Sequence, residues 1–148
     1  MPEKVKKQEG AARKQEELMT ERYMELQLVA STMQEMQGTI KQLDEQLVEI
    51  NSIKANLDRL GKSKPGSEML VPLNNGIFVK GRLEDNKELV VNVGSNVAVR
   101  KTIPDTKQLL DERMKELEAF RSQLLAELEK VGERAQALES ELVSLMPK

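Results

Sequence analysis

Apolar residues recur every seven positions along two long stretches of this chain, which flank a short valine-rich middle. In the first stretch the repeating positions hold Leu26, Val29, Met33, Met36, Ile40, Leu43, Leu47, Ile50 and Leu57. In the second stretch they hold Leu110, Met114, Leu117, Leu124, Leu128, Val131, Ala135, Leu138, Leu142 and Leu145. A strict seven-residue apolar repeat keeps one narrow seam of a helix against a partner helix. The pattern therefore predicts two coiled-coil helices, at residues 18–60 and 105–148.

The ends of these helices are predicted from individual residues. Gly61 follows the last repeat of the first helix, where glycine commonly ends a helix. The run Gly61–Ser63 resembles the end of a phosphate-binding loop, but it lacks the upstream glycine and closes a helix instead of opening one. Asp105 is assigned as the N-cap of the second helix. Residues 1–17 are charged and have no apolar rhythm, so we expect a charged tail or a frayed helix.

Residues 61–104 change to a period of two, which is typical of β-strands. The segments Asn74–Gly76 and Gly94–Asn96 contain residues that tolerate positive φ, and they predict tight turns. Pro72 cannot donate a ladder hydrogen bond, so the first strand should lie at a sheet edge. We therefore predict two β-hairpins between the helices and an α+β fold that is mostly α.

Four short strands with few aromatic side chains cannot bury a core alone. Their apolar faces need a surface to pack on, and the same element of another subunit could supply it. The segment 61–104 is therefore predicted to be an oligomerisation module. Its expected contact residues are Leu70, Leu73, Ile77, Val79, Leu83, Leu89, Val91, Val93, Val97 and Val99.

Two cations interrupt the apolar repeats, and together they suggest how the helices pair. If the helices run antiparallel with Leu60 beside Asp105, facing residues have numbers that sum to about 165. Lys54 then faces Asp111 and Glu112, and Arg121 faces Asp44 and Glu45. Each misplaced cation meets an acidic pair, which favours an internal antiparallel helix pair over two separate dimerising coils.

The same alignment brings the two ends of the chain together. There the helices carry more apolar residues than a two-helix seam can cover, and flexible methionine side chains suit surfaces that accept varied partners. These residues either close the end of the seam or form an adaptable hydrophobic binding surface. They are Leu18, Met19, Tyr23, Leu26, Leu138, Leu142, Val143, Leu145 and Met146.

Composition excludes several classes of function. The chain has 148 residues, of which 32% are charged and 2% aromatic, so a bulky globular core is not expected. It has no cysteine and no histidine, so we expect no enzyme, metal site or cofactor. A net charge of -2 without a clustered basic stripe argues against nucleic-acid binding. No apolar run is long enough for a membrane span, so a cytoplasmic protein is expected.

The middle of the chain resembles a known family. The segments Leu70–Leu73, Gly76–Gly81, Val90–Gly94 and Val97–Lys101 are similar in order and spacing to the LVP, glycine-turn-strand and VxVG segments of prefoldin subunits. Two hairpins between two helices of matched length are typical of the archaeal-type alpha class, because beta-class subunits have one hairpin.

The resemblance implies a hexamer of two alpha-class and four beta-class subunits whose hairpins assemble into β-barrels. It also implies an ATP-independent chaperone that holds unfolded clients near the coiled-coil tips and delivers them to a group II chaperonin. The alternative is a structural coiled-coil scaffold, or spacer, that holds no client.

Overall fold

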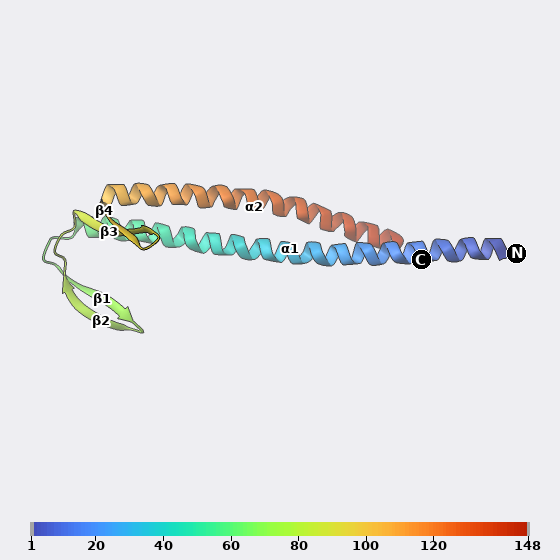
Figure 1. The fold of residues 1–148 in the computed structure, drawn as a ribbon, viewed down its shortest axis with the longest axis horizontal. Helices are drawn as coiled ribbons and strands as arrows, with labels where there is room; N and C mark the ends of the chain where they lie inside the picture. The colour runs from blue at the N-terminus through green and yellow to red at the C-terminus, as the bar shows by residue number, and fades with distance from the viewer. Residues whose placement is uncertain (1, 148) are drawn as a thin grey trace. The chain divides into compact units, whose positions relative to one another are not determined.

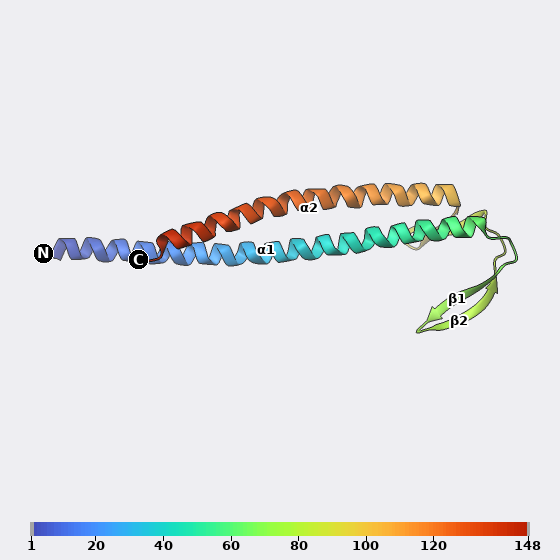
Figure 2. The ribbon, with the colours of Figure 1, turned by 180° about the vertical axis from the view of Figure 1, so that it is seen from behind.

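The computed structural model describes residues 2–147 and contains two long helices and four strands, as predicted. Figures 1 and 2 show the helices α1 and α2 and the two hairpins that connect them in the chain. The elements are α1 (Pro2–Lys62), β1 (Glu68–Asn74), β2 (Ile77–Arg82), β3 (Glu88–Gly94), β4 (Val97–Thr102) and α2 (Ile103–Leu145). The chain divides into two compact units, which are described separately: residues up to Leu43 with those from Phe120, and residues Asp44–Ala119.

The first unit is an antiparallel pair formed by the N-terminal part of α1 and the C-terminal part of α2 (Figure 2). Its seam follows the predicted repeat, since Ile40 and Leu43 are buried and Leu138 has no exposed surface. Gln15 donates a hydrogen bond of 2.6 Å from Nε2 to the carbonyl oxygen of Leu145, the last residue of α2. The α1 residues before Gln15 are all exposed and extend past the end of α2 as a single helix.

The segment of residues 2–17 is therefore helical in the structure. Its side chains are exposed because no second helix covers them. Lysine, glutamate, glutamine and alanine are good helix formers, so the segment can continue α1 without an apolar seam.

The second unit contains both hairpins and the helix ends that flank them. Here Ile50 and Leu57 of α1 are buried at repeat positions. Lys54 forms an ion pair with Asp111, which confirms that part of the alignment made from the sequence, and Lys107 pairs with Asp58 in the same register. The corresponding pairing of Arg121 stays a prediction.

The starting point of α2 differs from the prediction. The helix begins at Ile103, and the backbone N–H of Asp105 donates a 3.2 Å hydrogen bond to Thr102 Oγ1. Thr102 is thus the N-cap, and the assignment of Asp105 was wrong. Pro104 fits inside the first turn of α2, because the missing N–H of a proline costs no helix hydrogen bond there. At the other end, α1 stops one residue after Gly61, at Lys62.

Both hairpins close with turns of left-handed backbone. In the first, Asn75 and Gly76 have φ values of 50° and 78°, and in the second, Ser95 and Asn96 have values of 52° and 60°. Two consecutive residues of positive φ match the twist of the flanking strands, as in type I′ hairpins. The predicted turn segments are confirmed.

Asn86 lies in the loop between the hairpins and connects that loop to the end of α1 by hydrogen bonds. Its side-chain Nδ2 donates to the carbonyl oxygens of Ser63 at 2.8 Å, Leu60 at 3.2 Å and Gly61 at 3.4 Å. The last carbonyls of a helix have no partner within the helix, so this amide caps α1.

Changing Asn86 to alanine should lower the free energy of unfolding by about 1–2 kcal/mol, because the carbonyls of Gly61 and Ser63 lose this donor and that of Leu60 keeps only the backbone N–H of Ser63. Urea denaturation followed by circular dichroism measures the effect. The neighbouring exposed residue gives the control, since Lys87→Ala should change stability by less than about 0.5 kcal/mol. Equal effects of the two substitutions would show that the cap contributes nothing.

Candidate functional site

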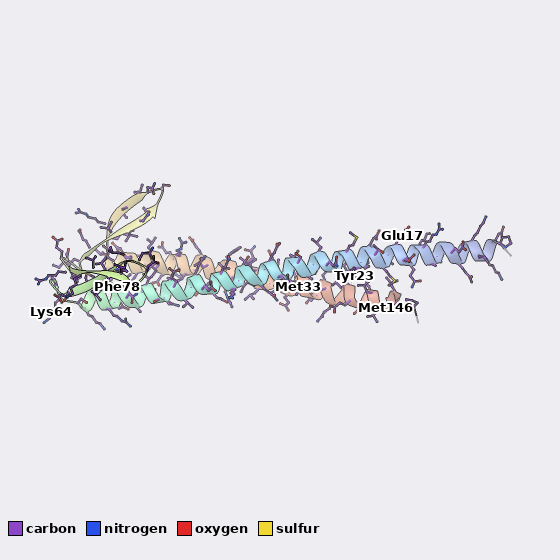
Figure 3. All side chains as sticks on the ribbon, turned by 90° about the horizontal axis from the view of Figure 1, so that it is seen from below. Glu17, Tyr23, Met33, Lys64, Phe78 and Met146 are labelled. Atoms are coloured by element: carbon purple, nitrogen blue, oxygen red, sulfur yellow. The ribbon has the colours of Figure 1, made fainter. Side chains whose placement is uncertain are left out.

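In the first unit, the C-terminal end of α2 and the stretch of α1 that faces it form an apolar groove, here called the tip groove. α1 contributes Glu16, Met19, Thr20, Tyr23 and Leu26, α2 contributes Leu142, and Met146 follows directly after α2. The groove has a volume of about 420 Å³. Tyr23 and Met146 lie in the same part of the molecule (Figure 3) and are 56% and 57% exposed. An open apolar groove of this size can accept side chains of another polypeptide.

The structure brings together part of the residue set predicted for this end of the chain. Met19, Tyr23, Leu26, Leu142 and Met146 share the tip groove. Of the other predicted residues, Leu18 and Leu145 are half-buried in the helix pair. Leu138 is fully buried, so it supports the seam and offers no surface. Val143 is 68% exposed and lines a different depression, with Gln136, Glu139 and Ser140.

Two exposed apolar residues near the tip escaped the sequence argument. Met24 is 64% exposed and Leu28 is 69% exposed. They lie four residues apart on one face of α1, away from the repeat positions. The sequence does contain the signal, because large apolar residues that fall outside a heptad seam have no intramolecular partner in a two-helix pair.

A network of charged side chains connects the helices beside the tip groove. Arg134 of α2 donates to Glu25 Oε1 of α1 from both Nε, at 3.0 Å, and Nη2, at 2.7 Å. Arg22 Nη1 donates to Glu25 Oε2 at 3.3 Å. Arg22 Nε lies 2.7 Å from Glu141 Oε2, but its N–H does not point at that oxygen, so this contact is an ion pair without a hydrogen bond. The network links α1 to α2 along one side of the apolar seam.

The network changes the acidity of its members. Hydrogen bonds from Arg134, with the positive charges of Arg134 and Arg22 nearby, lower the pKa of Glu25 below its ordinary value of 4.5. The same hydrogen bond to Glu25 raises the pKa of Arg134. Partial desolvation opposes both changes but is the smaller effect. Glu25 therefore stays ionised to a lower pH than a glutamate without these partners.

This shift predicts how the first unit responds to acid. A lowered pKa in the folded state means that Glu25 contributes stability at pH values above 4.5 and loses that contribution as the pH falls through the lowered value. Glu25→Gln should therefore melt at a lower temperature than the wild type at pH 7, and the difference should vanish in strong acid. Thermal melts between pH 7 and 2 test this. Glu21→Gln, one turn away and outside the network, should melt like the wild type throughout.

The hairpins of the second unit carry the other predicted set of residues. In the first hairpin, Val71 pairs with Val79 and Met69 with Gly81, so these residues share a face with Leu73 and Ile77. Leu70 pairs with Lys80 and therefore lies on the opposite face, while Leu83 lies beyond β2. In the second hairpin, one face holds all of the predicted residues: Leu89, Val91, Val93, Val97 and Val99.

These hairpin faces remain largely open. Val71, Ile77 and Val79 are 43%, 59% and 47% exposed, and Val93 and Val97 are about half exposed. Leu89, Val91 and Val99 are half-buried. Met69 and Val71 were not in the predicted set, because five consecutive apolar residues in β1 make both of its faces apolar and do not reveal which face continues the apolar face of β2. The pairing register supplies that information.

Residues 2–147 contain no group of His, Cys, Asp or Glu side chains that could hold a metal ion. Over the same range, no helix is long and apolar enough to cross a membrane.

Comparisons of the sequence and of the structure with known proteins both find prefoldin subunits. The Prefoldin family, described as "Prefoldin subunit", matches residues 29–147. The prefoldin subunit alpha of Pyrococcus horikoshii is 35% identical over 131 residues, covering 79% of this chain and 87% of the relative. That of Thermofilum pendens is 27% identical over 118 residues, covering 80% and 92%. A filamentous prefoldin from Methanocaldococcus jannaschii shares the fold with a TM-score of 0.71 at 21% identity, covering 78% of this chain and 95% of that one.

Proposed function

Because this chain belongs to the prefoldin family, as an alpha-class chaperone subunit, we propose that it captures unfolded client proteins in the tip groove without ATP. One observation carries this proposal: Tyr23 and Met146 are more than half exposed in an apolar groove where α2 ends. Unfolded chains expose apolar side chains, and burying them in such a groove removes both surfaces from water.

Weak, adaptable contacts suit a holdase. Met19 and Met146 supply flexible, polarisable surface that can adjust to different side chains. Tyr23 adds a rigid ring with a polar end. A groove of about 420 Å³ accommodates only a few side chains at once, so a single subunit should bind weakly. Several subunits acting on one client would raise the overall affinity.

Assembly is the second part of the proposal. The open apolar faces of the two hairpins support their packing on other subunits, and we assign the chain to a hexamer of two alpha-class and four beta-class subunits built around β-barrels. Held clients would pass to a group II chaperonin in the cytoplasm. The chain needs no cofactor or catalytic step for this role, because holding is a binding equilibrium.

The test is aggregation of a chemically denatured client, followed by light scattering after dilution into the chain assembled with a beta-class partner. We expect the assembled chain to suppress the light scattering of the client without ATP, and added ATP to have no further effect. If assembly is intact but scattering equals that of client alone, the chain is a structural scaffold instead. Omitting the beta-class partner shows how far holding depends on assembly.

A further inference from the structure

The two flanks of the helix seam near the tip differ in character. One flank is closed by the charged network of Arg22, Glu25, Arg134 and Glu141. On α1, residues 23 and 25 are about 200° apart around the helix, so Tyr23 and Glu25 belong to opposite flanks. Among the residues that the structure describes, the flank that carries Tyr23 has no such network and is hollowed instead.

The hollow on this flank continues beyond the tip groove. A second groove, of about 740 Å³, begins at Leu26, which also lines the tip groove. Its apolar floor contains Leu26, Ala30 and Met33 of α1 and Gly132 and Ala135 of α2. Small residues on both helices leave room there. Figure 3 shows Met33 further along α1 than Tyr23. We call the two grooves together the side groove.

The shape of the side groove suits a third helix. From Glu16 to Met33 it follows α1 for about 25 Å, the length of a helix of about 17 residues. Its apolar α1 residues are three or four positions apart, so they form a ridge against which the side chains of another helix can interdigitate. A helix also satisfies its own backbone hydrogen bonds, whereas an extended strand would need partners that two helices cannot offer.

The rim of the side groove is acidic. Glu16, Glu129, Glu133 and Glu139 line it and are exposed, and no lysine or arginine does so among the residues described. Within the described part of the chain, none of these four carboxylates belongs to an ion pair. Glu25 and Glu141, on the other flank, are paired with arginines. Unpaired acids beside an apolar floor favour a partner that combines apolar and basic side chains.

We propose that the side groove binds a client segment as a third helix, with lysine or arginine flanking the apolar stripe of that segment. This inference rests on the proposed holding function and specifies the class of client segment that the chain prefers. The groove then discriminates among unfolded chains by charge as well as by hydrophobicity, and it disfavours acidic segments.

Synthetic peptides of 18 residues test the proposal with the full chain assembled with its partner subunits. Three helix-forming peptides share one apolar stripe. All of their remaining positions carry lysine in the first peptide, glutamine in the second and glutamate in the third. Fluorescence anisotropy in low salt should give the lysine peptide about tenfold higher affinity than the glutamine peptide, and the glutamate peptide the weakest binding. Raising the salt to 0.5 M should reduce the preference to about twofold. A lysine peptide with a central proline, which cannot continue a helix, should lose binding.

Variants of the chain locate the effect. The triple change Glu129→Gln, Glu133→Gln and Glu139→Gln should abolish the preference for lysine. The matched control, Glu116→Gln, Glu118→Gln and Glu127→Gln, removes the same charge from exposed positions of α2 outside the groove and should keep the preference.

Equal affinity for the three peptides overturns the proposal, as does tight binding of the proline peptide or a triple variant that behaves like its control. Concentration-dependent self-association of the assembly, lost in the triple variant, would make a second copy the occupant and also overturn it. In each of these cases, suppression of client aggregation by the wild type would leave the holding function standing. A wild type that holds no client removes the holding function itself, whatever the peptides show.

Discussion

Replacing Tyr23 and Met146 by serine is expected to abolish suppression of client aggregation while leaving the fold unchanged. Each side chain is more than half exposed, so little folding energy depends on it. Each should bury most of its apolar surface when a client binds, which is worth about 1–2 kcal/mol. Losing both would weaken client affinity by about 100-fold. Light scattering of a denatured client gives the functional result, and thermal melting gives the stability.

The matched control for this variant is Met24→Ser with Leu28→Ser. These residues are 64% and 69% exposed on the same part of α1 but lie outside the tip groove. The control removes a similar amount of apolar surface and should keep holding. If both double variants lost activity equally, total apolar surface near the tip would matter and the groove would not.

Placing a charge on the apolar face of each hairpin is expected to prevent assembly. Val79→Asp and Val91→Asp alter residues in the middle of each hairpin, opposite Val71 and Val99. If these faces pack on other subunits, each aspartate buries an unpaired carboxylate at a cost of several kcal/mol, enough to raise the dissociation constant by about 1,000-fold or more. Size-exclusion chromatography with light scattering, in the presence of a beta-class partner, should then give a monomer. Circular dichroism should show the helices retained.

Val90→Asp is the control for the hairpin variant. Val90 neighbours Val91 but lies on the opposite face of the hairpin, where it is 75% exposed and pairs with Arg100. It should assemble normally. Failure of Val90→Asp to assemble, or normal assembly of Val91→Asp, would place the contact surface elsewhere.

The fold was predictable because its determinants are local and repeated. A seven-residue repeat defines the helix seams, and it is regular enough that one alignment matched Lys54 with Asp111. Turn residues such as Asn75 and Gly76 defined the hairpins through their tolerance of positive φ. The start of α2 was missed because Thr102 and Asp105 are both good N-caps, and only the backbone geometry chooses between them.

The candidate site was predictable in part. The antiparallel alignment of the helices predicted that Met19 and Tyr23 lie near Leu142 and Met146. All four residues line the tip groove. The sequence did not predict that Tyr23 and Met146 are exposed whereas Leu138 is fully buried. Apolar residues near the end of a repeat can point into the seam or out of it. The asymmetry of the two flanks also escaped the sequence argument. It depends on Arg134 reaching Glu25 across the seam, and side-chain directions of this kind come only from the folded geometry.

Site-specific photocrosslinking tests the central claim most directly, that unfolded clients are held where the helix pair ends. A photoreactive phenylalanine analogue replaces either Tyr23 or Phe120, two exposed aromatic residues of the first unit. Phe120 lies about 33 Å along α2 from Leu142. In the assembled protein, irradiation with a denatured client should crosslink the client to position 23 and leave position 120 unmodified. Equal crosslinking at both positions, or crosslinking at 120 alone, would contradict the account.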